Sequence, residues 1–264
     1  TILLMDLDRF KEVNDSLGHH VGDLLLQEIA QRCVTALARE SDTVARYSGD
    51  EFVAILADIP DTAVSRIADN LAQQMTLPFH PDGRQVYCTV SIGVAVCPGD
   101  GDDVETLIIK ADQAMYEVKK NGRNGWQFYT AQMQIESERR HTLYNELLDA
   151  LSRRELSVFY QPIVDAATLR VVSCEALARW RREDGQWVSP EQFISVAEER
   201  GIINRIDHLV LAAASQFIGE LNRQLQCDLA LAVNVSSRLL YLSDPVAQDW
   251  LGCVRAAGNI RLTV

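Results

Sequence analysis

The chain has 264 residues, of which 47% are hydrophobic and 23% are charged, and its formal net charge is −12. This composition excludes a disordered chain and predicts a globular protein with one large or two medium domains. The acidic balance also excludes a protein that grips nucleic-acid backbones, which needs a basic surface. It leaves room for a nucleotide site, because a nucleotide needs only local cations.

The cysteines and the apolar runs indicate the compartment. Six cysteines, none in Cys-x-x-Cys spacing, lie mostly in apolar stretches, so we expect reduced thiols in the cytoplasm. No signal peptide and no run of about 18 apolar residues is present, so this segment is expected to make no membrane contact. A longer parent protein that is anchored in a membrane through segments outside this chain is compatible with that expectation. Because the chain begins and ends on strand-like runs, 1–5 and 260–264, we expect a fragment of a longer protein.

The first half alternates between strands and helices. A buried strand at 1–5 leads to a short helix at 9–17 and an amphipathic helix at 21–37. A hairpin follows, with strands at 43–47 and 52–56 around Ser48-Gly49. A helix at 61–75, a strand at 85–96, a helix through 107–118 and a strand at 126–129 complete the half. This order predicts an α+β layer with helices on an antiparallel sheet.

Acidic side chains gather at one predicted point of that sheet. Asp6 ends the first strand, and Asp50 and Glu51 follow the hairpin turn on what we expect to be the neighbouring strand. Taken alone, the hairpin would be interpreted as an acidic turn in solvent. Three converging acids repel one another, however, and bound cations relieve that repulsion. Two metal ions held this way suit nucleotidyl transfer.

Several ordered motifs of the first half resemble the GGDEF domain of bacterial diguanylate cyclases. They are Asp6-Leu7-Asp8-Arg9-Phe10-Lys11 with Asn14-Asp15, Gly18-His19-His20-Val21-Gly22-Asp23, Arg46-Tyr47-Ser48-Gly49-Asp50-Glu51-Phe52, Val90-Ser91-Ile92-Gly93-Val94-Ala95, and Ala111-Asp112-Gln113-Ala114-Met115-Tyr116 with Lys119 and Gly122-Arg123-Asn124. The resemblance implies a palm-like nucleotidyl-cyclase fold at 1–130. It also implies condensation of two GTP molecules to cyclic di-GMP by a homodimer with one GTP on each copy.

The resemblance also assigns roles to residues. It makes Asp50 and Glu51 the catalytic acids, and Asp6, Asp50 and the Leu7 carbonyl the ligands of Mg²⁺ or Mn²⁺. The implied GTP-binding residues are the backbone at Arg9, Phe10 and Lys11, the guanine readers Asn14 and Asp23, and the phosphate-binding pair Lys119 and Arg123. Spacing alone would put Lys119 and Arg123 on one helical face. Each residue also has a plain structural interpretation, as a turn, a cap or a helix-end cation.

A second constellation, Arg39-Glu40-Ser41-Asp42, precedes the hairpin. It is similar to the inhibitory cyclic di-GMP site of the family, where arginine and aspartate bind the phosphate and guanine edges. The alternative for Arg39 and Asp42 is an exposed salt bridge at a helix end.

The sequence departs from the family motif at Ser48, where the usual residue is glycine. Serine adds a Cβ and a hydroxyl, which narrow the pocket and restrict positive φ. Two functions therefore stay open for this domain. It is either a cyclase, or a GTP-binding regulatory module without cyclase activity that tunes a phosphodiesterase.

The second half begins with a helical linker at 131–142 and a helix from 143. Strands at 158–164, 171–180, 229–235 and 261–264 alternate with helices at 190–199, 203–221 and 245–256, which predicts a truncated α/β barrel of parallel strands. Four motifs resemble the EAL domain of cyclic di-GMP phosphodiesterases: Tyr160-Gln161-Pro162-Ile163-Val164-Asp165, Glu175-Ala176-Leu177-Ala178-Arg179-Trp180, Pro190-x-x-Phe193-Ile194 with Ala197-Glu198-x-x-Gly201, and Asn234-Val235-Ser236.

This second resemblance covers 143–264 and implies that Glu175 and Asn234 bind metal, that Arg179 clamps a phosphate and that Gln161 touches the ligand. Further acidic ligands and the general-base lysine are expected beyond Val264, so this chain alone is not expected to be a competent phosphodiesterase.

Overall fold

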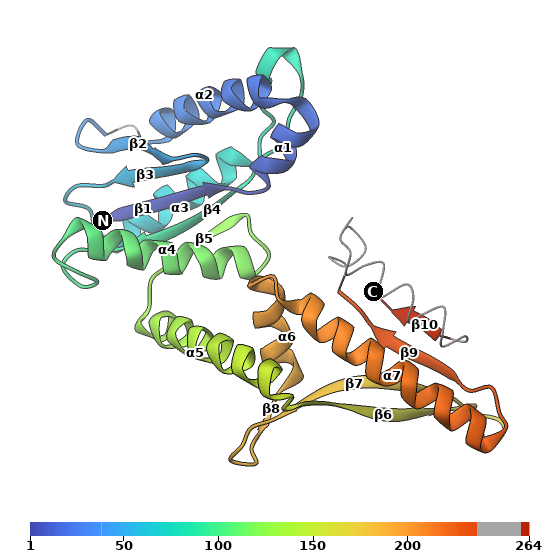
Figure 1. Ribbon diagram of the computed structural model, residues 1–264. Helices are drawn as coiled ribbons and strands as arrows, with labels where there is room; N and C mark the ends of the chain where they lie inside the picture. Colours follow the sequence, from blue (N-terminus) through green and yellow to red (C-terminus); the bar gives the residue numbers. More distant parts are fainter. Residues whose placement is uncertain (38, 237–259, 264) are drawn as a thin grey trace. The chain divides into compact units, whose positions relative to one another are not determined.

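The computed structural model describes residues 1–37, 39–236 and 260–263, and the chain divides into two compact units at Glu138 and Arg139. Each unit has its own sheet and its own apolar core, and the elements of both are labelled in Figure 1. The helix predicted at 245–256 lies outside the described residues.

The first unit is built on a sheet of five strands. Their order across the sheet is β2 (Thr43–Ser48), β3 (Glu51–Ile55), β1 (Ile2–Leu7), β4 (Val90–Ala95) and β5 (Gly125–Phe128). Strand β1 is central and antiparallel to both β3 and β4, as predicted for the first strand and the hairpin. The prediction of an antiparallel sheet is wrong at the edge, where β5 runs parallel to β4. The helix between these two strands carries the chain back to the other end of the sheet, which makes them parallel.

Helices cover both faces of this sheet. Helices α2 (His19–Ala36) and α3 (Asp61–Met75) pack on the face that carries Leu3 and Met5, while α4 (Val104–Lys120) packs on the face of Ile2 and Leu4. Figure 1 shows α2 and α4 on opposite sides of the strands. Because both faces are buried, β1 reads as a continuous apolar run rather than an alternating one. The short helix α1 (Phe10–Leu17) connects β1 to α2.

The predicted linker at 131–142 is part of one helix, α5, which runs from Ala131 to Arg153. No glycine or proline interrupts these residues, so the polar first half continues without a break into the apolar second half. Leu143, Leu147 and Ala150 bury the second half of α5 in the core of the second unit.

The sheet of the second unit has the order β10 (Ile260–Thr263), β9 (Ala230–Asn234), β7 (Val171–Arg181) and β6 (Leu156–Val164), with β8 (Trp187–Val188) paired to β7. Strands β7, β9 and β10 are parallel, as the barrel prediction requires. The prediction is wrong for β6, which is antiparallel to β7. The connection between them, 165–170, is too short for a crossover helix, so the chain turns back as a hairpin.

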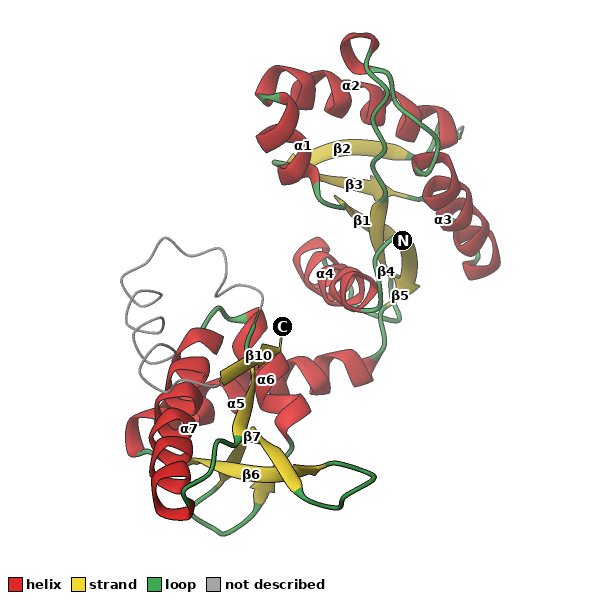
Figure 2. Ribbon diagram, turned by 90° about the vertical axis from the view of Figure 1, so that its right-hand side faces the viewer, coloured by secondary structure: helices red, strands yellow, loops and turns green. Residues whose placement is uncertain are grey.

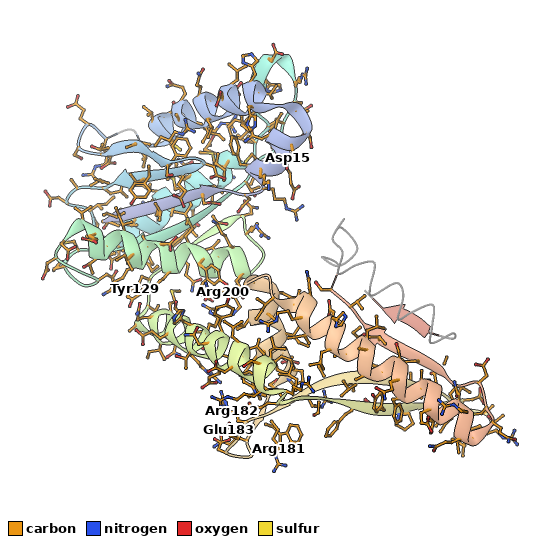
Figure 3. All side chains as sticks on the ribbon, viewed as in Figure 1. Asp15, Tyr129, Arg181, Arg182, Glu183 and Arg200 are labelled. Atoms are coloured by element: carbon orange, nitrogen blue, oxygen red, sulfur yellow. The ribbon has the colours of Figure 1, made fainter. Side chains whose placement is uncertain are left out.

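Helices α6 (Pro190–Glu199) and α7 (Ile203–Leu225) accompany this sheet, and Figure 2 shows them in red beside the yellow strands. The ring of Phe217 on α7 stacks on Tyr160 of β6, with 3.7 Å between ring centroids. The turn that carries Arg182 and Glu183, labelled in Figure 3, is tied to α5, since Arg182 pairs with Glu146 at 2.6 Å.

Candidate functional sites

Three acidic residues lie together at the carboxyl end of β1. Asp6 is directly opposite Glu51 in the register of β1 and β3. The hairpin turn places Asp50 next to them, because the Leu7 N–H donates to the Asp50 carbonyl oxygen at 3.3 Å. Arg46 braces the same turn by donating from Nε to the Gly49 carbonyl oxygen at 2.8 Å. Adjacent strand pairing therefore brings together the acids that the sequence places 44 positions apart (50 − 6).

The charges at this point are crowded. Burial raises the pKa of Asp6, and the ion pair with Lys119 Nζ at 2.8 Å opposes that rise. Burial also raises the pKa of Glu51, and the negative charges of Asp6 and Asp112 raise it further. Partly desolvated acids that repel one another gain from a nearby cation, as Lys119 already illustrates.

Side chains alone do not complete a metal site in the described part of the chain, where no three His, Cys, Asp or Glu residues form a group that could hold an ion. Magnesium commonly takes only one or two carboxylates and completes its shell with waters and substrate phosphates. Asp6, Asp50 and the Leu7 carbonyl fit that pattern, because oxygen ligands and negative charges that repel one another meet at the end of β1.

The start of helix α1 faces this region without a cap. Arg9 precedes the helix in a left-handed conformation, with φ 59°, and its side chain makes no capping hydrogen bond. The first amides of a helix have no intrahelical partner and favour an anion. The backbone of Arg9, Phe10 and Lys11 therefore offers a place for phosphate.

Asn14 on α1 lies against α2. Its Oδ1 atom is buried and has no hydrogen-bond partner in the described structure. Gly22 makes this approach possible, since a Cβ there would lie 1.9 Å from Asn14 Oδ1. The next residue, Asp23, is exposed and borders a cavity of about 470 Å³ between α2 and the β2–β3 hairpin. An unsatisfied carbonyl oxygen and a carboxylate are acceptors that suit the N1–H and N2–H donors of guanine.

The structure corrects the expectation for Lys119 and Arg123. Lys119 lies in the last turn of α4, but the helix ends at Lys120, and Arg123 lies in the following loop with φ 65°. Gly122, with φ 111°, turns the chain at this point, and the Arg123 N–H donates back to the Val118 carbonyl oxygen at 2.9 Å. The two cations therefore do not share a helical face.

The serine of the hairpin adopts an ordinary backbone conformation. Ser48 ends β2, pairs with Glu51, and follows a bulge in the strand. Gly49, with φ 43°, takes the left-handed position, whereas Ser48 has no positive φ. The departure from glycine at position 48 consequently adds an exposed side chain without backbone strain.

Arg39 and Asp42 pair with each other, with 3.7 Å between Nη1 and Oδ1. The Asp42 side chain is fully buried, and neither of its oxygens has a hydrogen-bond partner among the described residues. Arg39 is occupied elsewhere, since it donates to the Ala57 carbonyl oxygen at 2.9 Å. Buried carboxylates usually have hydrogen-bond partners, and a ligand that brings N–H donors would supply the ones that Asp42 lacks.

In the second unit, the predicted ligand residues converge on neighbouring strands. Asn234 Nδ2 on β9 donates to Glu175 Oε1 on β7 at 2.8 Å. Gln161 on β6 is directly opposite Glu175. Arg179 lies further along β7, where it donates to the Ala178 carbonyl oxygen and borders a cavity of about 180 Å³.

Sequence reasoning missed two buried acids. Asp207 of α7 is 5% exposed and accepts a hydrogen bond from the Ser236 N–H at 3.2 Å, and burial raises its pKa to about 6. Asp8, directly after β1, is 7% exposed. For Asp207 the available signal was an acid on the apolar face of a helix, among Ile206, Val210 and Leu211.

The first unit thus gathers acids where β1 ends beside the β2–β3 turn, and the second places Glu175 and Asn234 on adjacent parallel strands. The family model for "Diguanylate cyclase, GGDEF domain" matches residues 1–125, and the EAL domain model matches residues 144–258. The chain belongs to the GGDEF–EAL proteins, which act in cyclic di-GMP signalling.

Known proteins resemble most of the chain. A bifunctional diguanylate cyclase/cyclic di-GMP phosphodiesterase of Pseudomonas aeruginosa, MucR, is 39% identical over 89% of this chain and 34% of its own length. The cyclic di-GMP phosphodiesterase NbdA of the same organism is 38% identical over 88% of this chain and 30% of its own. The chain thus spans about a third of the length of these relatives.

The solved structure of the S helix–GGDEF–EAL segment of Vibrio cholerae LapD, bound to c-di-GMP, covers 99% of this chain and 61% of its own, with a TM-score of 0.57. At 17% identity it supports the fold alone. Within the described residues, the helices lack the length and apolar character needed to cross a bilayer.

Proposed function

We propose that the first unit binds GTP with Mg²⁺ and condenses two GTP molecules to cyclic di-GMP, and that the second unit belongs to a cyclic di-GMP phosphodiesterase. The observation that carries the first half of this proposal is the meeting of Asp6, Asp50 and Glu51 at the end of β1, beside the uncapped start of α1. A homodimer would bring together two such sites, each with one GTP.

Each residue has a task in this reaction. The 3′-hydroxyl of one GTP attacks the α-phosphate of the other, and pyrophosphate leaves. When bound, the metal ions would activate the hydroxyl and offset charge on the phosphates. Asp6, Asp50 and the Leu7 carbonyl would hold those ions. Glu51, whose pKa is raised by burial, is suited to accept the hydroxyl proton. Asn14 and Asp23 would bind guanine.

The test is Asp50→Ala in the full chain. We expect magnesium-dependent GTP binding to disappear, because the variant removes one of two metal carboxylates, and titration calorimetry with and without Mg²⁺ measures this. Asp102→Ala removes an exposed carboxylate before α4 and should bind GTP as the unchanged chain does. Equal affinities for Asp50→Ala and the control would refute the metal-site assignment.

A regulatory function is the second candidate. The observation that favours it is the side chain that Ser48 adds beside the acidic turn, where the family motif has glycine. In that case the first unit binds GTP without condensing it and tunes the phosphodiesterase. Product chromatography after incubation of the complete parent protein with GTP and Mg²⁺ separates the two, because only a cyclase forms cyclic di-GMP. Ser48→Gly should increase the product if the added side chain obstructs the site.

We propose that Arg39 and Asp42 bind cyclic di-GMP as a site of product inhibition. The support is the buried Asp42 carboxylate, whose two oxygens lack hydrogen-bond partners among the described residues. In a complete protein with cyclase activity, Arg39→Ala should raise the cyclic di-GMP concentration needed for half-inhibition by about tenfold, the effect of losing one charge-assisted contact. Arg84→Ala, at an exposed position, is the control. If Arg39→Ala does not change product inhibition, Arg39 does not bind cyclic di-GMP and forms only a surface salt bridge.

For the second unit, we propose that Glu175 and Asn234 are metal ligands, that Arg179 holds a phosphate and that Gln161 contacts cyclic di-GMP. The hydrogen bond between Asn234 and Glu175 supports their joint role. In a protein with the complete domain, Glu175→Gln should abolish hydrolysis of cyclic di-GMP with Mg²⁺ or Mn²⁺. Hydrolysis at the original rate would exclude Glu175 as a ligand.

A further inference from the structure

Asp8 lies where three segments of the first unit meet. Its Oδ1 accepts a hydrogen bond from Ser91 Oγ at 2.7 Å, and its Oδ2 accepts from Thr89 Oγ1 at 2.6 Å and from the Asn124 N–H at 3.1 Å. The Asp8 N–H also donates to the Thr89 carbonyl oxygen at 2.9 Å. The carboxylate thus joins the end of β1, the entry to β4 and the loop after α4.

The loop after α4 needs such an anchor. Gly122, Arg123 and Asn124 follow one another with φ of 111°, 65° and 50°. Left-handed conformations are unfavourable for residues other than glycine, so two of these three need support from their surroundings. The hydrogen bond from the Asn124 N–H to Asp8 supplies it directly after Arg123, the predicted phosphate-binding cation. Asp8, Arg9 and Arg123 border one cavity of about 530 Å³.

No acidic side chain stands at the capping position of α1. The side chain that caps a helix belongs to the residue directly before its first turn, which here is Arg9. Both Asp8 carboxylate oxygens are taken by Ser91, Thr89 and Asn124, and α1 begins without a side-chain cap. The Glu12 N–H donates to the Arg9 carbonyl oxygen, and the Phe10 and Lys11 N–H groups at the helix start are the ones suited to an anionic ligand.

We infer that Asp8 is a positioning residue for the GTP phosphates, acting through the loop that carries Arg123. This inference rests on the proposed GTP-binding function. Asp8 itself touches no phosphate, since its oxygens are buried and satisfied. Its removal should therefore weaken binding of the triphosphate while sparing the base and ribose.

The experiment compares GTP, with Mg²⁺, and guanosine, which carries no phosphate, by titration calorimetry on the full 264-residue chain. Asp8→Asn keeps the shape but points an amide group at one of the three donors. We expect its GTP affinity to fall at least about tenfold, the scale of a lost hydrogen bond to a charged group, with guanosine affinity unchanged. Thr89→Val removes one donor with little change of shape and should show a smaller loss of the same kind. Thr35→Val makes the same change on an exposed helix face and should leave both affinities unchanged.

The measured affinities distinguish a failure of GTP binding from a failure of the positioning role of Asp8. If the unchanged chain binds neither GTP nor guanosine, the proposed function fails. Suppose that the unchanged chain binds both ligands. The positioning role is then overturned if Asp8→Asn and Thr89→Val lower the affinities for GTP and guanosine by the same factor, or if they lower neither affinity. Should Asp8→Asn not fold, Thr89→Val decides, because that position is part-buried and its hydroxyl is one donor among three.

Discussion

Gly93→Ala is expected to lower the free energy of unfolding of the first unit by about 3 kcal/mol or more, the upper range for overpacking a core. Gly93 lies in the middle of β4, paired with Leu4 of β1 and Gln127 of β5. A Cβ at this position would lie 1.8 Å from the Ala111 carbonyl oxygen and 2.4 Å from the Met115 nitrogen. Both are backbone atoms of α4, so no side-chain rotation relieves the contact and the helix itself must move from the sheet.

The consequences reach the candidate site, because α4 carries Lys119, the partner of Asp6. Gly125→Ala is the matched control. This residue is also a strand glycine of the same sheet, and the nearest atom to its added Cβ is 3.9 Å away. Urea unfolding followed by circular dichroism should show an earlier first transition for Gly93→Ala and little change for Gly125→Ala. If Gly93→Ala unfolds at the same urea concentration as the unchanged chain, α4 can move away from the sheet at no cost, which would contradict the prediction.

The sequence was sufficient to predict features that depend on local patterns. The apolar run at the start of the chain and the turn residues Ser48-Gly49 predicted β1 and the β2–β3 hairpin, and their pairing brings Asp6 beside Glu51 as expected. The direction of each strand was harder to predict from the sequence, because it depends on how the chain connects one strand to the next. Strand β5, which follows a helix, and strand β6, which a short turn joins to β7, both ran opposite to the expectation.

Spacing also failed where a helix ended. Positions 119 and 123 are four apart, but the shared face disappears once Gly122 turns the chain after α4. Similarly, the role of Asp8 depends on hydrogen bonds with residues 81 to 116 positions away, which no local pattern encodes. The same holds for the contact of Asn14 with Gly22, which joins two different helices.

Gly22→Ala is expected to reduce GTP affinity about tenfold without unfolding the chain, on the scale of one or two lost hydrogen bonds. The added Cβ would meet Asn14 Oδ1 at 1.9 Å and Asn14 Cγ at 3.0 Å. Because these atoms belong to a flexible side chain, Asn14 can swing away at little cost to the fold. Alanine also favours the helical conformation of α2 over glycine. The fold should survive, while the buried acceptor proposed to bind guanine leaves its position.

The guanine role gives this variant a specific signature. Displacement of Asn14 should lower the ratio of GTP affinity to ATP affinity. Asn14 Oδ1 is proposed to accept from the N–H donors of guanine, and adenine does not present donors in the same pattern. Asn14→Ala should show a similar loss, and the double variant should be no worse than either single one, since both remove the same contact. Gly219→Ala, at a helix glycine of α7 where no atom of the described residues lies within 4 Å of the added Cβ, is the control and should bind GTP normally. Competition binding with GTP and ATP measures the preference, and a Gly22→Ala chain that discriminates as well as the original would show that Asn14 does not bind the base.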